Sequence, residues 1–256
     1  MKTYLLKRSV FFLLSYIAVA LPWIPGNLQA HDVEGFGGIS GAQHLVLITR
    51  GGTLYDNWYG ALGKEAPKNT HPAYPKAGKQ KGASTWRCKE CHGWDYKGAR
   101  GAYAKGSHYT GTMGIRNMTH APVDTIVAIL KGDTHGYGKL IPDEDLTALA
   151  HFVAHGQMDM DAYIDRATKK AKGDAANGER IFQTTCARCH GSDGKLINFK
   201  TPPKAEYIGT VATANPWEAL HKLRMGQPGV PMISMLAFDT QDHLDILAYA
   251  QTLPTK

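Results

Sequence analysis

Two copies of one five-residue pattern, at residues 88–92 and 186–190, constrain this chain more than any other feature of its sequence. Each copy reads Cys-x-x-Cys-His, and together the copies use all four cysteines. This spacing is the attachment signature of c-type haem: two thiols bond one porphyrin, and the next histidine is the proximal ligand of its iron. A structural zinc site usually needs a second ligand pair, and no further cysteine pair remains. We therefore predict two covalently bound haem c groups, attached through Cys88 and Cys91 with His92, and through Cys186 and Cys189 with His190.

Residues 1–30 have the pattern of a secretory signal peptide. Three basic residues precede an uncharged apolar run at residues 10–21, and Ala30 provides a small residue before the predicted cleavage point. An uncleaved membrane anchor is the alternative, although a membrane span needs about 20 apolar residues, and Pro22 and Pro25 break the end of this shorter run. Export predicts a periplasmic location, which suits bacterial haem attachment, and a retained N-terminus would add membrane association.

The basic composition does not indicate a nucleic-acid-binding protein. The formal net charge of +7 approaches neutrality once the three basic residues of the signal are removed and haem propionates are added. No run of lysine and arginine with interleaved aromatic residues is present, as a nucleic-acid groove would require. Dispersed lysines instead favour docking to acidic redox-partner proteins.

Amphipathic patterns predict a chain of short helices separated by loops rich in glycine and proline. Residues 31–43 are expected to form an irregular lead-in, and the segment from Gly51 is expected to begin the first helix, with Leu54, Tyr55 and Trp58 on its buried face. Further helices are predicted at Val123–Leu130, Pro142–Ala154, Ala176–Thr185, Pro216–Arg224 and Asp239–Thr252.

The two halves of the chain form a repeat. His92 precedes Leu146 by 54 residues, and His190 precedes Leu244 by the same 54. Before the motifs the halves differ, because Leu54 lies 34 residues ahead of Cys88 whereas only 5 separate Ile181 from Cys186. The first half therefore carries an insertion of 29 residues.

This order of helices around Cys-x-x-Cys-His resembles the class I (mitochondrial-type) cytochrome c family. Residues 177–182 before the second motif and 226–232 after it carry the resemblance over residues 174–256; residues 51–156 resemble the family less closely. The resemblance implies an all-α fold with two tandem cytochrome c-like domains, each a few short helices around one haem. The predicted organisation is a signal peptide at 1–30, domain 1 at 31–160 with its insertion around 56–85, a linker at 161–173 and domain 2 at 174–256.

The distal ligands are harder to assign. Met232 stands where the family places its axial methionine, with Met235 as the alternative. Moving back from Met232 by the repeat offset of 98 reaches Thr134, next to His135, so we predict that His135 is the distal ligand of the first haem. The competitors for this role lie earlier in the chain, and four histidines in predicted helices are expected to be solvated. The competitors are His108, Met113 and Met118, and the four helical histidines are His151, His155, His221 and His243.

Three functions fit these observations. The first is a periplasmic di-haem cytochrome c that transfers electrons between redox partners, because two six-coordinate irons would leave no position for a substrate. The second is a di-haem oxidoreductase similar to thiosulfate dehydrogenases or peroxidases, although the cysteine expected as a distal ligand in the former is missing here. The third is a cytochrome subunit of a larger respiratory oxidoreductase, with the 29-residue insertion as its docking surface.

Overall fold

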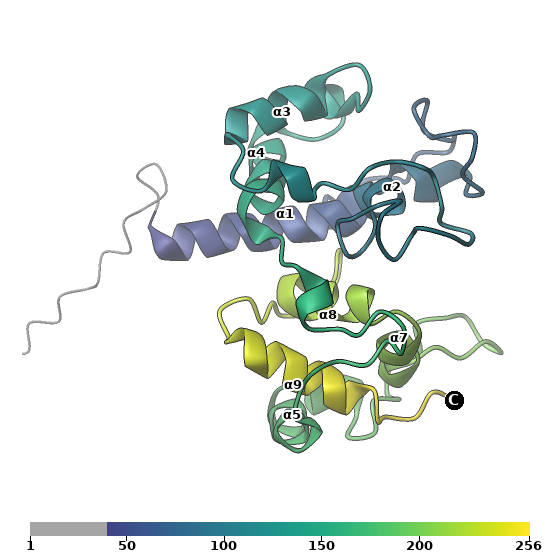
Figure 1. The fold of residues 1–256 in the computed structure, drawn as a ribbon, viewed down its shortest axis with the longest axis vertical. Coiled ribbons are helices and arrows are strands. Elements are labelled where there is room, and N and C mark those ends of the chain that lie inside the picture. The colour runs from purple at the N-terminus through teal and green to yellow at the C-terminus, as the bar shows by residue number, and fades with distance from the viewer. Residues whose placement is uncertain (1–39) are drawn as a thin grey trace, which may run out of the picture.

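The computed structural model describes residues 40–256, and within this range the chain forms helices and no strand. The predicted signal peptide at residues 1–30 lies outside the described residues. Every helix of residues 40–256 falls short of the length and apolar character that a membrane span requires. The helical content agrees with the all-α prediction, and the helices gather into two groups that follow the two halves of the chain (Figure 1).

The first group contains the helices around the first Cys-x-x-Cys-His motif (Figure 1). A long helix, α1, packs against α4 and its π-helical extension η5, and α3 packs against α4. The predicted buried face of α1 is confirmed, because Leu54, Tyr55 and Trp58 are each at most 2% exposed. The elements are α1 (Gly41–Ala61), α2 (Cys88–His92), α3 (Val123–Lys131), α4 (Asp143–His151) and η5 (Phe152–Gly156), with 3-10 turns at Gly82–Trp86, Arg116–Met118 and Tyr137–Lys139.

The second group repeats this arrangement with shorter segments. Helix α5 packs along α9, as α1 packs along α4, and α7 and α8 lie beside them. The elements are α5 (Ala175–Ile181), its π-helical extension η7 (Phe182–Cys186), α6 (Ala187–His190), α7 (Ile208–Ala214), α8 (Pro216–Met225) and α9 (Thr240–Ala250).

Helix α1 begins ten residues before the predicted start at Gly51. Ser40 and Gln43 form a capping box, in which the Ser40 side chain accepts from the Gln43 amide while the Gln43 side chain accepts from the Ser40 amide. These bonds satisfy amides that a helix end leaves without partners, so a stable helix can start in a segment without hydrophobic periodicity. The expectation of an irregular lead-in is therefore wrong from residue 41 onward. Sequence periodicity also missed α7.

Glycines allow the paired helices to approach closely. A Cβ atom on Gly51 of α1 would collide with the backbone carbonyl of Ala148 in α4, and one on Gly178 of α5 would collide with that of Asp245 in α9. The two glycines lie 41 and 12 residues ahead of the motif histidines, a difference equal to the 29-residue insertion. The same helix crossing thus occurs in both halves.

Replacing Gly178 with alanine should lower the free energy of unfolding by about 1–3 kcal/mol, because the new methyl group must displace the α9 backbone. The matched control is Gly132→Ala, at the end of α3, where φ is −65° and the nearest atom to the added Cβ is 3.4 Å away. Thermal or denaturant unfolding of both variants provides the measurement. Equal stability of the two variants would contradict a tight crossing.

The predicted linker packs against both groups. Ile164 is 1% exposed. Arg166 pairs with buried Asp95 of the first group, and the Ala171 amide donates to the Gln251 side chain of the second group at 3.1 Å. The main hydrophobic cluster also includes side chains from α1, α4, α8 and α9. The halves therefore share buried surface, although the domain boundaries themselves stay predictions.

Candidate functional site

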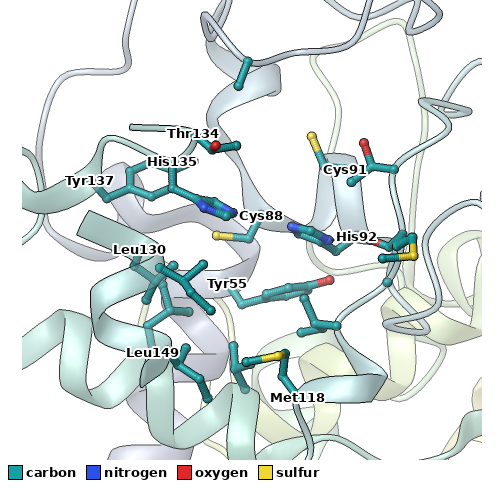
Figure 2. A pocket seen from close by; sticks show the side chains of 18 of the residues that line it. Tyr55, Cys88, Cys91, His92, Met118, Leu130, Thr134, His135, Tyr137 and Leu149 are labelled. Carbon is teal, nitrogen blue, oxygen red and sulfur yellow. Dashed lines mark hydrogen bonds between the residues drawn. The ribbon is translucent and has the colours of Figure 1, made fainter. Parts of the chain in front are cut away.

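A cavity of about 420 Å³ opens beside the first Cys-x-x-Cys-His turn. Cys88, Cys91 and His92 from α2 lie on one side of it, and His135, from the loop after α3, faces them (Figure 2). Apolar side chains from α1, α3 and α4 form much of the remaining wall. They include Tyr55, Ile126, Leu130, Leu149 and, from η5, Val153.

The imidazole rings of His92 and His135 have the separation expected for two axial ligands of one iron. Their centroids are 6.3 Å apart and their planes differ by 24°. Two metal–nitrogen bonds of about 2.0–2.1 Å and half of each ring would place such centroids roughly 6 Å apart. The sequence offset that selected His135 thus leads to a residue that faces His92. Its assignment as ligand stays a prediction.

His92 is held in the tautomer that metal coordination requires. Its Nδ1 atom lies 2.7 Å from the backbone carbonyl oxygen of Met113, which can only accept a hydrogen bond. Nδ1 therefore carries the proton and leaves the Nε2 lone pair available, the arrangement typical of metal-bound histidines. Burial lowers the pKa of His92 to about 4, so the ring is neutral at physiological pH.

The insertion positions the distal loop. His71, from the inserted segment, donates from Nε2 to the carbonyl oxygen of His135 at 3.1 Å. The hydroxyl of Tyr137 donates to the carbonyl oxygen of Trp86 at 2.9 Å. These bonds tie the loop that carries His135 to the chain just before α2. The extra residues therefore build one wall of the cavity.

The other candidate ligands at the first motif are placed less favourably. The Nδ1 atom of His108 lies 2.8 Å from Oε1 of Glu90, and His108 does not line the cavity. Met113 and Met118 do line it, but the Met113 side chain is 59% exposed. Met118 lies low in the cavity near Tyr55 (Figure 2), away from the space between the two histidines.

The cavity wall also carries a buried ion-pair network. Arg87 lines the cavity and pairs with Asp56, which is fully buried and pairs in addition with Lys222 of α8. Burial raises the pKa of Asp56, but Lys222 and Arg87 outweigh it, so the pKa of this carboxyl lies below its usual value. The network joins the first cavity to the second half of the chain.

The second Cys-x-x-Cys-His turn repeats the first in detail. Each motif histidine is followed by a glycine in the left-handed region, with φ of 79° and ψ of 159° at Gly93 and φ of 82° and ψ of 155° at Gly191. The carbonyl oxygen of His92 accepts from Gly98 at 2.8 Å, and that of His190 accepts from Leu196 at 2.9 Å. The same backbone therefore presents both histidines.

His190 is half-buried, and burial lowers its pKa. Its Nδ1 atom is buried without a hydrogen-bond partner among residues 40–256, unlike that of His92. Cys186 is half-buried against an apolar cluster, while Cys189 is exposed. An exposed thiol at this position suits a haem whose edge reaches the protein surface.

The structure separates the two candidate methionines of the second site. Met235 is 2% exposed and belongs to the cluster that contacts Cys186, together with Phe182 and Ile246. Its carbonyl oxygen accepts from Nε2 of His243 at 2.7 Å, which fixes the backbone there. Met232 is half-buried and lines a different cavity, between α1 and the loop before α9. The packing favours Met235 over the sequence-based choice of Met232.

Three histidines that were predicted to be solvated are buried in the structure. His221 is 0% exposed, and its ring connects the hydroxyl of Tyr96 at 2.8 Å with the carbonyl oxygen of Gly52 at 3.0 Å. Burial lowers its pKa to about 4. His243 is 2% exposed and His151 is 6% exposed. The prediction that these histidines are solvated is wrong; the spacing of His221 four residues after buried Trp217 was an available signal.

A comparison with known families finds a match in the second half of the chain. Residues 173–249 match the family model described as Cytochrome C oxidase, cbb3-type, subunit III. The match supports a c-type cytochrome. Such a domain implies covalently bound haem c, and cytochrome c domains generally pass electrons to redox partners. The matched range contains the second motif and both candidate methionines. No curated protein matches the chain.

Proposed function

We propose that this chain is a di-haem c-type cytochrome, built from two tandem domains, that transfers electrons between redox-partner proteins in the periplasm. The observation that carries the proposal is the repeated motif turn: both histidines are followed by glycines with nearly the same φ and ψ. The recurring glycine crossings, Gly51 with α4 and Gly178 with α9, support two domains of one kind.

At the first centre, Cys88 and Cys91 would hold the porphyrin through thioethers, and His92 and His135 would hold the iron. The hydrogen bond from His92 to Met113 orients the proximal ring. Ile126, Leu130 and Leu149, named above in the cavity wall, would exclude water from the porphyrin face and so favour the less charged, reduced state. Bound haem supplies the one-electron couple of its iron.

At the second centre, Cys186 and Cys189 would hold the porphyrin and His190 the iron, with Met235 as the distal ligand that packing favours. A thioether ligand raises the reduction potential relative to an imidazole. Electrons would therefore run from the first centre to the second. The shared core connects the two halves, because His221 of the second half is hydrogen-bonded to Tyr96 and to Gly52 of the first half.

Two observations bear on the alternatives. Each centre has a candidate distal ligand, and all four cysteines belong to the motifs, so neither iron is expected to offer an open position to a substrate. This argues for a carrier over an oxidoreductase of the thiosulfate dehydrogenase or peroxidase kind. The family description names an oxidase subunit, which favours a cytochrome subunit of a larger respiratory complex as the second candidate.

The haem content of the purified protein tests the proposal. We expect two covalent haems per chain by haemochrome absorption and by mass, and one in the double variant Cys88→Ser, Cys91→Ser. The double variant Cys186→Ser, Cys189→Ser should also retain one haem and serves as the reciprocal control. A wild-type protein with a single haem would refute the di-haem assignment. Cell fractionation with N-terminal sequencing tests the periplasmic location separately.

A further inference from the structure

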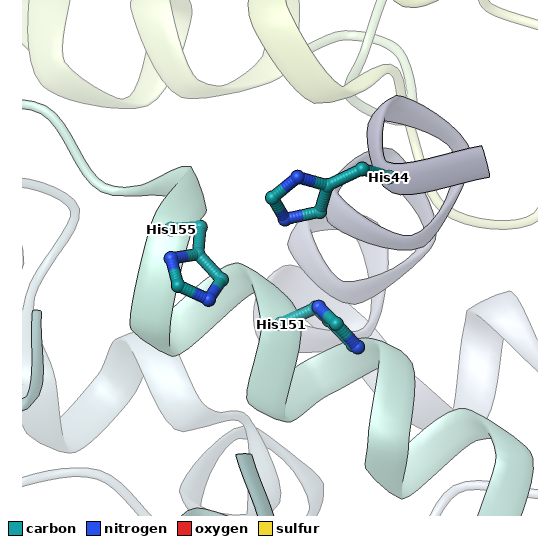
Figure 3. A group of neighbouring side chains, drawn as sticks. All are labelled: His44, His151 and His155. Atoms are coloured by element: carbon teal, nitrogen blue, oxygen red, sulfur yellow. The ribbon is translucent and has the colours of Figure 1, made fainter. Parts of the chain in front are cut away.

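Three histidines outside both haem centres converge where α1 meets the end of α4 (Figure 3). His44 lies near the start of α1, His151 is the last residue of α4, and His155 lies in η5. One ring nitrogen from each falls within 4.8 Å of the other two. The ring of His44 has centroid separations of 5.4 Å from His151 and 5.1 Å from His155.

This geometry is close to that of a three-histidine metal site. Nitrogens bound to one ion at about 2.0–2.1 Å in tetrahedral geometry lie roughly 3.3 Å apart. Side-chain rotations that move each ring nitrogen by about an ångström would therefore bring these atoms into place. Imidazole donors suit zinc, copper and nickel, whereas magnesium and calcium prefer oxygen ligands. The donor set therefore selects a divalent transition metal.

The surroundings hold the cluster rigidly and leave one ring atom unsatisfied. His151 is 6% exposed, and its Nδ1 atom is buried without a hydrogen-bond partner among the described residues. Buried polar atoms of proteins almost always have a partner, which a bound ion would provide. The helices that carry the cluster are fixed to each other by the Gly51 crossing and by the ion pair between Arg50 and Asp145 at 2.6 Å.

The protonation states also suit a cation. Burial and then His44 lower the pKa of His151. Burial, followed by His44, His151 and His120, lowers that of His155. Both shifts favour the neutral ring, and only neutral imidazole can donate a lone pair to a metal.

We infer that His44, His151 and His155 bind one divalent transition-metal ion, with Zn²⁺ as the ion whose tetrahedral preference suits three imidazoles and a water molecule. The site is separate from both Cys-x-x-Cys-His motifs. The ion would tie α1 to the end of α4. Because Tyr55 of α1 and Leu149 of α4 line the first cavity, it would also stabilise that wall.

Calorimetric titration of the purified di-haem protein with Zn²⁺ at neutral pH, together with metal analysis after dialysis, tests this site. We expect one Zn²⁺ per chain, and an affinity at least about 10-fold lower in His44→Gln and in His155→Gln. Both side chains are half-buried, so the variants should fold, and an unchanged haem spectrum would verify this.

The control is His108→Gln, which removes a histidine that is 42% exposed and lies outside the cluster. It should bind Zn²⁺ as the wild type does. The inference is overturned if the wild type binds no stoichiometric Zn²⁺, if the cluster variants bind it as tightly as the wild type, or if His108→Gln weakens binding as much as they do.

Discussion

Substitution of His135 by alanine is expected to convert one of the two ferric haems from low spin to high spin and to leave the other unchanged. The reason is geometric: the His135 ring faces His92 with a centroid separation of 6.3 Å across the cavity, and alanine provides no donor atom in its place. The reduction potential of the affected haem should also change, since axial ligation is a principal determinant of potential. Ferric absorption spectra and spectroelectrochemical titration of the purified protein measure both effects.

His108→Ala is the matched control, because His108 was a competing candidate but pairs with Glu90 outside the cavity. It should retain two low-spin haems. A His135→Ala protein with both haems low-spin and unshifted would reject His135 as the ligand. If Met118→Leu then produced the high-spin signal, the ligand would be Met118, the less exposed of the two methionines that line this cavity.

The second large effect is expected from Met235→Leu. Leucine keeps the apolar volume in the cluster around Phe182 but removes the thioether. The second haem should then lose its methionine-to-iron charge-transfer absorption and become high-spin, with a potential shift on the order of 100 mV. Absorption spectroscopy and redox titration provide the measurement.

Met232→Leu makes the same chemical change three residues earlier and is the matched control. Because Met232 lines the cavity beside α1, the second haem should keep its spectrum and potential. The opposite pattern, with Met232→Leu losing the absorption and Met235→Leu retaining it, would restore the ligand that the family resemblance suggested. The pair of variants therefore decides between the two methionines.

The prediction of helices from sequence was correct where hydrophobic periodicity and motif spacing agreed. The buried face of α1 was predicted, with Leu54, Tyr55 and Trp58 on it. The start of α1 was missed because it depends on the capping hydrogen bonds of Ser40 and Gln43 and not on periodicity. His221 was misplaced because its burial depends on Tyr96, which lies 125 residues away in the chain.

The sequence by itself determined the cofactor chemistry, because two Cys-x-x-Cys-His motifs that use every cysteine permit few alternatives, and spacing of this kind is a local property of the chain. Only the tertiary structure decided which side chains meet. The approach of His135 to His92, the burial of Met235 beside Cys186 and the assembly of His44 with His151 all follow from how the helices cross. Those crossings depend on contacts between distant residues, such as Gly51 against Ala148. Local periodicity reports which face of a helix is buried, but not which partner covers that face.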